Sequence, residues 1–262
     1  MKFNDCGIII NIKKYGEKSF IIKVFTENLG IIRGFVKFGI SKKTQQIYQV
    51  GNVITLSYVA RTEEALGSFI NCDLITNYSS KFIFDKLRLN CVKSILSMLD
   101  EYFLERQSFG NLFFDFNNFL NELSDFNFSN NQLIANYIKL ELSILENLGY
   151  GIDFSSCVVS NSVVNLAYVS PKSAQAVSFE AGERYAHKLL RLPDFLKIND
   201  DENNQKIDNE NLLDGLNLSG YFLHKNLVTI NNNFKANENL SNNFYRENII
   251  KILKNVVPNQ YL

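Results

Sequence analysis

Residues 7–26 decide the first half of the fold, and they read GIIINIKKYGEKSFIIKVFT. Two β-branched and aromatic runs, Gly7–Lys14 and Ser19–Thr26, flank the polar stretch Tyr15-Gly16-Glu17-Lys18. A short polar connection that contains Gly between two such runs is typical of a β-hairpin. The stretch therefore predicts two antiparallel strands joined by a tight turn.

Three further runs of the same kind follow, and they are Gly30–Val36, Asn52–Arg61 and Leu66–Tyr78. The connection Glu27-Asn28-Leu29 is short enough to continue the antiparallel meander, whereas a longer loop starts at Lys37. Five short strands in about 75 residues are too few for two packed sheets. They favour a small closed or nearly closed barrel of the OB or SH3-like kind.

From Ser80 onward the hydrophobic period changes from two to about 3.6, which indicates helices. The first helical stretch runs to Phe103 with Ser80 as its N-cap, and Gly149 is the expected C′ residue of another. Further helices are expected over 111–123, 130–148, 178–191, 212–227 and 243–254. Strands are expected at Cys157–Val159 and Leu166–Val169, and a solvated loop at 199–211.

We therefore predict an α+β protein with two domains. Residues 1–79 form the barrel, which we expect to bind nucleic acid, and residues 80–262 form a mainly helical domain with a short irregular or extended insert around 150–176. No uninterrupted apolar run reaches about 18 residues, so a membrane span is not expected. Nothing at the amino terminus resembles a signal peptide.

The charge of the chain is unevenly distributed although Lys+Arg and Asp+Glu both number 27. Residues 1–80 carry ten basic and six acidic side chains, and residues 81–262 carry 17 and 21. The barrel is thus a basic module joined to a mildly acidic body. The four cysteines form no CxxC pair, which indicates a reduced cytoplasm.

The usual catalytic constellations are missing, and we do not expect an enzyme. The chain has no HExxH, GxSxG or GxGxxG motif. Gly34 and Gly39 have phosphate-loop spacing, but Ile40 stands where the phosphate-binding Lys is required. His187 and His224 have no second ligand at metal-binding spacing, so no metal or other cofactor is expected.

Cations and aromatic rings alternate along the basic module. Cations neutralise phosphates, and aromatic faces stack on unpaired bases. The predicted DNA-binding residues are Lys13, Lys14, Lys18, Arg33, Lys37, Phe38, Lys42, Lys43 and Arg61, with Tyr15, Phe35 and Tyr48 interleaved. The alternative is that Phe35 and Tyr48 fill the barrel while the lysines only keep the protein in solution.

An ordered series of short motifs extends over essentially the whole chain. In the first part these are Asp5-x-Gly7-Ile8-Ile9-Ile10, Tyr15-Gly16-Glu17, Phe25-Thr26-Glu27, Gly30, Arg33-Gly34, Lys37-Phe38-Gly39-Ile40-Ser41 and Gln49-Val50-Gly51. In the second part they are Leu148-Gly149-Tyr150-Gly151-Ile152-Asp153, Leu166-Ala167-Tyr168-Val169-Ser170-Pro171-Lys172, Glu180-Ala181-Gly182, Leu192-Pro193-Asp194-Phe195-Leu196 and Ser219-Gly220-Tyr221-Phe222-Leu223. The ordered set resembles the RecO family of bacterial DNA repair proteins.

This resemblance implies an amino-terminal OB-fold barrel followed by a helical domain. It implies a recombination mediator, without enzymatic activity and without use of ATP, that binds single- and double-stranded DNA and anneals complementary strands. The implied partners are RecR and single-stranded DNA-binding protein, with RecA loaded indirectly onto DNA. The rival hypotheses are an RNA-binding OB protein of translation or RNA processing, and a pure protein scaffold.

The chain departs from the family pattern in two places. Family members often have Gly-Gly-Arg or Gly-Ala-Arg after the position of Lys37, where this chain has Phe38-Gly39-Ile40, so one cation is lost and an aromatic ring gained. Some members carry a four-cysteine zinc site after the Leu-Gly motif, whereas this chain retains only Cys157 there. We therefore expect the protein to contain no zinc.

We expect the helical domain to hold the acidic, hydrophobic tail of single-stranded DNA-binding protein, because an apolar tail needs an apolar groove with a cation at its rim. Five basic residues are candidates for that rim, and each could equally be an ordinary solvated side chain. They are Arg106, Lys139, Arg184, Lys188 and Arg191.

Overall fold

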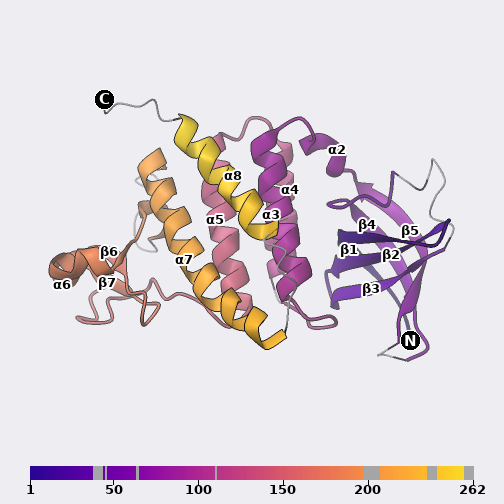
Figure 1. Ribbon diagram of the computed structural model, residues 1–262, viewed down its shortest axis with the longest axis horizontal. Helices are drawn as coiled ribbons and strands as arrows, with labels where there is room; N and C mark the ends of the chain where they lie inside the picture. Colours follow the sequence, from indigo (N-terminus) through magenta and orange to yellow (C-terminus); the bar gives the residue numbers. More distant parts are fainter. Residues whose placement is uncertain are drawn as a thin grey trace. The chain divides into compact units, whose positions relative to one another are not determined.

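The amino-terminal strands close into a barrel (Figure 1). The computed structural model describes residues 1–37, 44, 46–62, 65–109, 111–197, 207–234 and 241–256. The barrel strands are β1 (Lys2–Tyr15), β2 (Ser19–Thr26), β3 (Gly30–Val36), β4 (Val53–Val59) and β5 (Gly67–Thr76). They are hydrogen-bonded in the order β1-β2-β3-β5-β4, and β4 returns to β1. The predicted OB-fold is confirmed, and the hairpin strands β2 and β3 have the predicted bounds.

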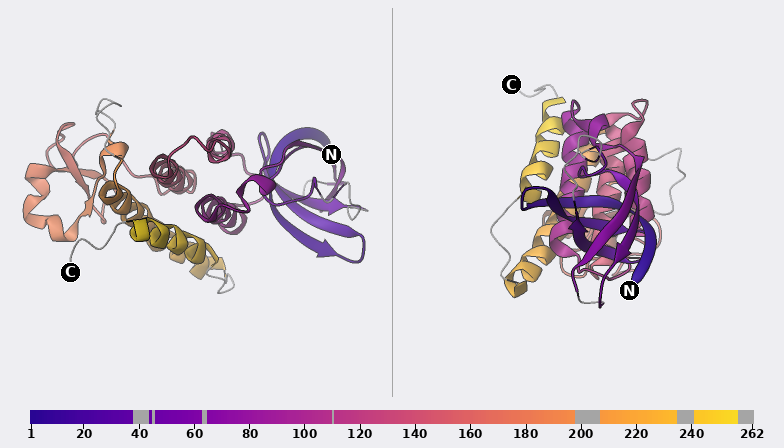
Figure 2. Two further views of the ribbon diagram at one scale, coloured as in Figure 1. Left: turned by 90° about the horizontal axis from the view of Figure 1, so that it is seen from above. Right: turned by 90° about the vertical axis from the view of Figure 1, so that its right-hand side faces the viewer.

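Closure depends on β1, which is long enough to pair with two strands. Its first half pairs with β4 and its second half with β2, and the register shifts between Ile9 and Asn11. This irregularity lets the strand bend around the barrel, as Figure 2 shows. The other contact that closes the barrel is parallel and short, and joins β3 to β5 only from Gly34 to Val36. The first half of β3 therefore has no partner in β5.

Alternating side chains fill the barrel. Ile22 and Val24 of β2 are fully buried, and they pack with Ile32, Ile54 and other apolar residues in one cluster. Because side chains alternate along a strand, the residues between them face outward. This alternation gives the sheet an outer face that can carry charge.

The helices after the barrel begin differently from the prediction. Instead of one helix that starts at Ser80, a single turn, α2 (Ser79–Phe82), precedes α3 (Lys86–Tyr102). Asp85 is the N-cap of α3, and its carboxylate accepts the backbone N–H of Arg88 at 3.0 Å. Asp85 also forms a 2.7 Å ion pair with the buried Arg88 side chain, which stabilises the break.

The remaining long helices follow the predicted pattern. Ser129 and Gln132 form a capping box at the start of α5, and Gly149 has a φ of +85° just after its end, as expected of a C′ glycine. The helices are α4 (Leu112–Ser124), α5 (Asn130–Asn147), α7 (Asn209–Phe234) and α8 (Ser241–Val256). Of the predicted loop 199–211, residues 199–206 lie outside the described residues, and the last three residues belong to α7 instead.

The segment between α5 and α7 differs most from the prediction. Cys157–Val159 is not a strand, because the N–H of Asn161 donates to the carbonyl of Cys157 at 2.8 Å and turns the chain back. The predicted helix 178–191 is also wrong: only α6 (Phe179–Gly182) is α-helical, and residues 183–188 wind as a 3-10 helix, η1. The chain must then extend, because Leu190 and Arg191 pair with the predicted strand at Leu166–Val169. The small sheet contains β6 (Leu166–Val169), β7 (Ala176–Ser178) and β8 (Leu190–Arg191), and η2 (Asp194–Leu196) follows it.

The chain divides into two compact units. The first, which we call the barrel unit, comprises Met1–Asp125 and Leu240–Arg246, and the second comprises Phe126–Asn239 and Glu247–Leu262. Helices α3 and α4 thus belong with the barrel. Within the second unit, α5 and α7 lie side by side (Figure 1). Among the described residues, no helix has the length and apolar character needed to cross a bilayer.

A close backbone contact at Gly30 attaches the chain after α3 to the barrel. Gly30 has a φ of +68°, and a Cβ built there would lie 1.8 Å from the carbonyl oxygen of Gln107. Gly16 has a similar φ of +64°, but among the described residues nothing lies within 4 Å of its Cβ position. The two glycines therefore share a left-handed backbone conformation, but only Gly30 is in close contact with another segment.

We predict that Gly30→Ala destabilises the protein far more than Gly16→Ala. A left-handed conformation costs an L-residue about 1–2 kcal/mol at either site. At Gly30 the contact with Gln107 must also open, which adds roughly 2 kcal/mol or more. Urea unfolding followed by circular dichroism measures the difference, and equal losses for the two variants would contradict the described contact.

Candidate nucleic-acid interface

The outer face of β1, β2 and β3 carries two of the predicted DNA-binding cations, Lys13 and Arg33, and Lys37 directly follows β3. Strand register places Lys13 beside Ile21, and Ile21 beside Phe35, in one row across the three strands. The neighbouring row joins Lys23 to Arg33. Since Ile22 and Val24 point into the core, both rows lie on the outside of the barrel.

One half of this face combines aromatic rings with exposed lysines. The rings of Tyr15 and Phe35 meet edge to face with their centroids 5.1 Å apart, and Tyr15 is 56% exposed. Lys13 and Lys37 are exposed beside them. We call Lys13, Tyr15, Ile21, Phe35 and Lys37 the open half of the face.

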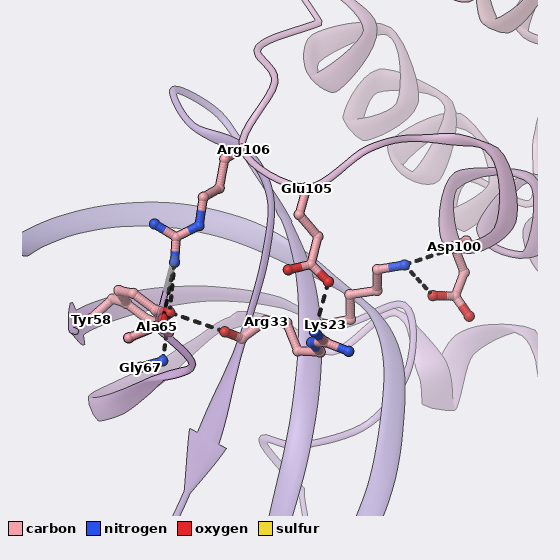
Figure 3. A network of polar contacts seen from close by, with 8 residues as sticks. All are labelled: Lys23, Arg33, Tyr58, Ala65, Gly67, Asp100, Glu105 and Arg106. Atoms are coloured by element: carbon pink, nitrogen blue, oxygen red, sulfur yellow. Dashed lines mark hydrogen bonds and ion pairs between the residues drawn. The ribbon is translucent and has the colours of Figure 1, made fainter. Parts of the chain in front are cut away.

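The other half is held by acidic residues from the end of α3 and the chain after it. The Nζ of Lys23 lies 2.9 Å from Oδ1 of Asp100 and also donates to the Asp100 carbonyl oxygen at 2.7 Å (Figure 3). Asn11 donates to the same carboxylate. The Nε of Arg33 lies 3.2 Å from Oε1 of Glu105. These contacts connect the strands to the chain that follows α3.

Backbone pairing positions Glu105. The half of β3 that β5 leaves unpaired meets residues 105 and 106 instead: Ile31 forms a parallel bridge with Glu105. The backbone N–H of Arg106 donates to the Ile31 carbonyl at 2.8 Å. Arg106 has a φ of +64°, an uncommon conformation for a residue with a side chain.

The side chain of Arg106 reaches the hydroxyl of Tyr58 (Figure 3). Its Nη2 lies 3.3 Å from the Tyr58 hydroxyl and 3.4 Å from the Ala65 carbonyl oxygen. The same hydroxyl donates to the Arg33 carbonyl at 3.0 Å and accepts the Gly67 N–H at 2.9 Å. One buried tyrosine thus joins β3, the start of β5 and the chain after α3.

The structure brings several of the predicted DNA-binding residues together around the open half. Lys14 and Lys18 are exposed at the β1–β2 turn, and Arg33 lies in the adjoining row. Arg61 is exposed in the connection to β5, whose first residues pair with Gly34 and Phe35. Phe38, Lys42 and Lys43 lie outside the described residues.

Two of the interleaved aromatic residues, Tyr48 and Phe35, have different positions. Tyr48 packs against the barrel core, and burial, with a contribution from Cys72, raises the pKa of its phenol. Phe35 lies on the outer face instead, against Tyr15. The interpretation that an aromatic residue fills the barrel therefore holds for Tyr48, whereas Phe35 and Tyr15 remain available for stacking.

The predicted rim residues for a partner do not share one element. Arg106 belongs to the barrel unit and contacts the barrel. The other four belong to the second unit: Lys139 is on α5, Arg184 and Lys188 are on η1, and Arg191 is on β8. All four are exposed.

Two acidic residues of the site, Asp100 and Glu105, carried no signal in the sequence. Asp100 lies in an ordinary helical pattern, and Glu105 in a short stretch without periodicity. Their role follows only from the path of the chain beside β3, which no local pattern encodes. The same holds for Tyr58, which reads as one of many strand aromatics.

Cys157 is buried in the turn that replaced a predicted strand. Burial raises the pKa of its thiol, but hydrogen bonds from the Ser160 hydroxyl and from the backbone N–H groups of Ser178, Ser160 and Val159 outweigh it and lower the pKa to about 6. Across the ranges that the structure describes, no cluster of three or more His, Cys, Asp or Glu residues could hold a metal ion. The expected absence of zinc stays a prediction.

Comparison with known proteins places both parts of the chain. A family model described as "Recombination protein O N terminal" matches residues 1–78, and one described as "Recombination protein O C terminal" matches residues 84–231. The DNA repair protein RecO of Rickettsia bellii (strain OSU 85-389) is 40% identical over 227 residues, which cover 87% of this chain and 90% of the relative. The RecO protein of Rickettsia canadensis (strain McKiel) is 39% identical over 238 residues, 91% of this chain and 94% of the relative.

We predict that Arg106→Ala lowers stability by more than Arg106→Gly. Both variants lose the guanidinium contacts with Tyr58 and Ala65, at about 1 kcal/mol. The alanine variant keeps the left-handed strain already present in the unmodified protein, whereas glycine adopts this conformation freely and recovers about 1 kcal/mol. Chemical denaturation of both variants tests this, and a glycine variant less stable than the alanine variant would show that the backbone strain is not as described.

Proposed function

The chain belongs to the RecO family of DNA repair proteins, and on that premise we propose that its barrel binds single- and double-stranded DNA and anneals complementary strands. The observation that carries the proposal is the open half of the outer face, where the Tyr15–Phe35 ring pair lies between the exposed Lys13 and Lys37. DNA repair is the function of the family. The mode of DNA binding is our proposal.

Each component of the open half suits a different part of a single strand. Lysines bind phosphates as point charges and release condensed counterions, whatever the base sequence. Aromatic rings stack on unpaired bases, which duplex DNA keeps inside the helix. OB-fold barrels use the outer face of strands 2 and 3, with the loops after strands 1 and 4, for this purpose. Lys18 and Arg61 lie in those two loops.

Annealing then requires no covalent chemistry. Two complementary strands repel each other through their phosphates, and bound cations reduce that repulsion. A strand held by its backbone and by one or two stacked bases still presents the other bases for pairing. We therefore propose that the protein acts as a mediator without enzymatic activity or cofactor. The free energy of base pairing alone drives the annealing.

The remaining partners are proposed from the family. The chain works with RecR and with single-stranded DNA-binding protein, and so helps RecA load onto covered DNA in the bacterial cytoplasm. We propose that the barrel domain spans residues 1–79 and that residues 80–262 hold the acidic tail of single-stranded DNA-binding protein. Four exposed cations of the second unit support this role, and they are Lys139, Arg184, Lys188 and Arg191.

We predict that reversing Lys37, Lys42 and Lys43 together to Glu weakens single-stranded DNA binding at least about tenfold. Up to three phosphate contacts are lost, so the slope of log K against log salt falls by up to about 2, at roughly 0.7 per contact. Fluorescence anisotropy at several salt concentrations measures both quantities. The matched control reverses Lys139, Arg184 and Lys188, and an equal loss in the control would remove the site from the barrel.

We predict that Tyr15→Ala weakens binding to single-stranded DNA by about 1–3 kcal/mol, because one stacked base loses its ring. Binding to a duplex of equal length should change by less than twofold, and Tyr15→Phe should behave as the unmodified protein. Tyr185→Ala is the control, since Tyr185 is comparably exposed but lies in η1. Equal losses on single strands and duplex would mean that Tyr15 does not stack on a base.

A further inference from the structure

Two cations lie next to each other on the outer face, and each meets a carboxylate, one from the last turn of α3 and one from the chain after it. Lys23 and Arg33 are cross-strand neighbours, and their partners are Asp100 and Glu105. The two pairs differ in how firmly they are held. That difference decides which cation can exchange its partner.

The ion pair between Lys23 and Asp100 is firmly held. Its side chains are 18% and 29% exposed, and Lys23 makes a second contact with the Asp100 carbonyl at the end of α3. The Asp100 carboxylate also accepts a hydrogen bond from the side-chain amide of Asn11. Separating Lys23 from Asp100 would break several contacts together, so this pair is structural.

The ion pair between Arg33 and Glu105 is weakly held. Arg33 is 54% exposed, and its contact with Glu105 joins one guanidinium nitrogen, Nε, to one carboxylate oxygen at 3.2 Å. Exposed pairs of this kind contribute little stability. A phosphate can occupy the same guanidinium edge with two parallel hydrogen bonds, which a single Nε contact does not supply.

The backbone around Glu105 is held independently of its side chain. The bridge between Ile31 and Glu105 and the hydrogen bond from Arg106 to Ile31 involve main-chain atoms alone. The carboxylate can therefore leave Arg33 while residues 105 and 106 stay paired with β3. Arg33 also lies only two residues from Phe35 of the open half, so a strand stacked there brings its phosphates near the guanidinium.

We propose that Glu105 is an internal competitor for DNA: its carboxylate occupies Arg33 in the free protein and gives way to a phosphate of a single strand bound at the open half. The inference rests on the proposed function and adds a regulating residue to it. Glu105 lowers the affinity and thereby keeps the bound strand exchangeable, as annealing requires.

The test is a double-mutant cycle of Glu105→Gln and Arg33→Gln, with labelled oligothymidine as the probe in fluorescence anisotropy. Glu105→Gln should tighten binding about two- to fivefold, the range expected for removing an exposed ion pair. It should also increase the salt slope by about 0.7, one further phosphate contact. In the Arg33→Gln background the same substitution should change affinity by less than half as much.

A charge-matched control and a stability measurement complete the design. Glu101→Gln removes one negative charge from the last turn of α3 without removing the partner of Arg33, and it should leave affinity nearly unchanged. Thermal melting should show the same midpoint within a few degrees for Glu105→Gln and the unmodified protein.

The outcomes separate the inference from the function on which it rests. If the unmodified protein binds in a salt-dependent manner but Glu105→Gln has the same affinity, or tightens binding equally without Arg33, the competition is refuted and the function stands. If the unmodified protein does not bind the oligonucleotide at all, the proposed function fails, and the inference with it.

Discussion

The barrel unit depends on the hydrogen bonds of the Tyr58 hydroxyl group. It donates to the Arg33 carbonyl, accepts the Gly67 N–H and accepts a guanidinium N–H of Arg106. The ring itself packs in the core between Phe3 and Phe69. A buried hydroxyl with all its partners fixes geometry because losing one of them leaves a polar group unsatisfied. The path of β3, the start of β5 and the docking of the chain after α3 therefore depend on one side chain.

Because the chain after α3 docks there, one half of the outer face is used for structural contacts and the other half is left for a ligand. The chain after α3 completes the unpaired half of β3, and its Glu105 pairs with Arg33, while Asp100 in the last turn of α3 pairs with Lys23. Beyond this contact, Lys13, Tyr15 and Lys37 keep their exposure. If the positive charge were spread evenly, DNA would bind over the whole outer face of the barrel. Here the charge is concentrated on one half, which suits a protein that must bind a strand and also release it.

The sequence was sufficient for the elements that local patterns encode. Hairpin spacing indicated the bounds of β2 and β3, and the glycine at 149 marked the end of α5. It failed where tertiary contacts decide: Asp85 rather than Ser80 caps a helix, and pairing with β6 extends the chain at Leu190. For the site, the sequence left open whether Phe35 faces outward or fills the barrel, and no pattern could reveal that Glu105 meets Arg33. Arg33 and Glu105 are 72 positions apart in the sequence, and a contact over that separation cannot be inferred from periodicity.

Hydrogen–deuterium exchange of the full chain with and without oligothymidine tests the central claim most directly, because it reports where a bound strand lies without altering any residue. The claim is that DNA occupies the open half, between the β1–β2 turn and the end of β3. Peptides that cover Lys13–Phe20 and Arg33–Lys37 should exchange more slowly when the oligonucleotide is bound, while those of α5 and α7 remain unchanged. Slower exchange confined to α5 and α7, with the barrel peptides unaffected, would contradict the account.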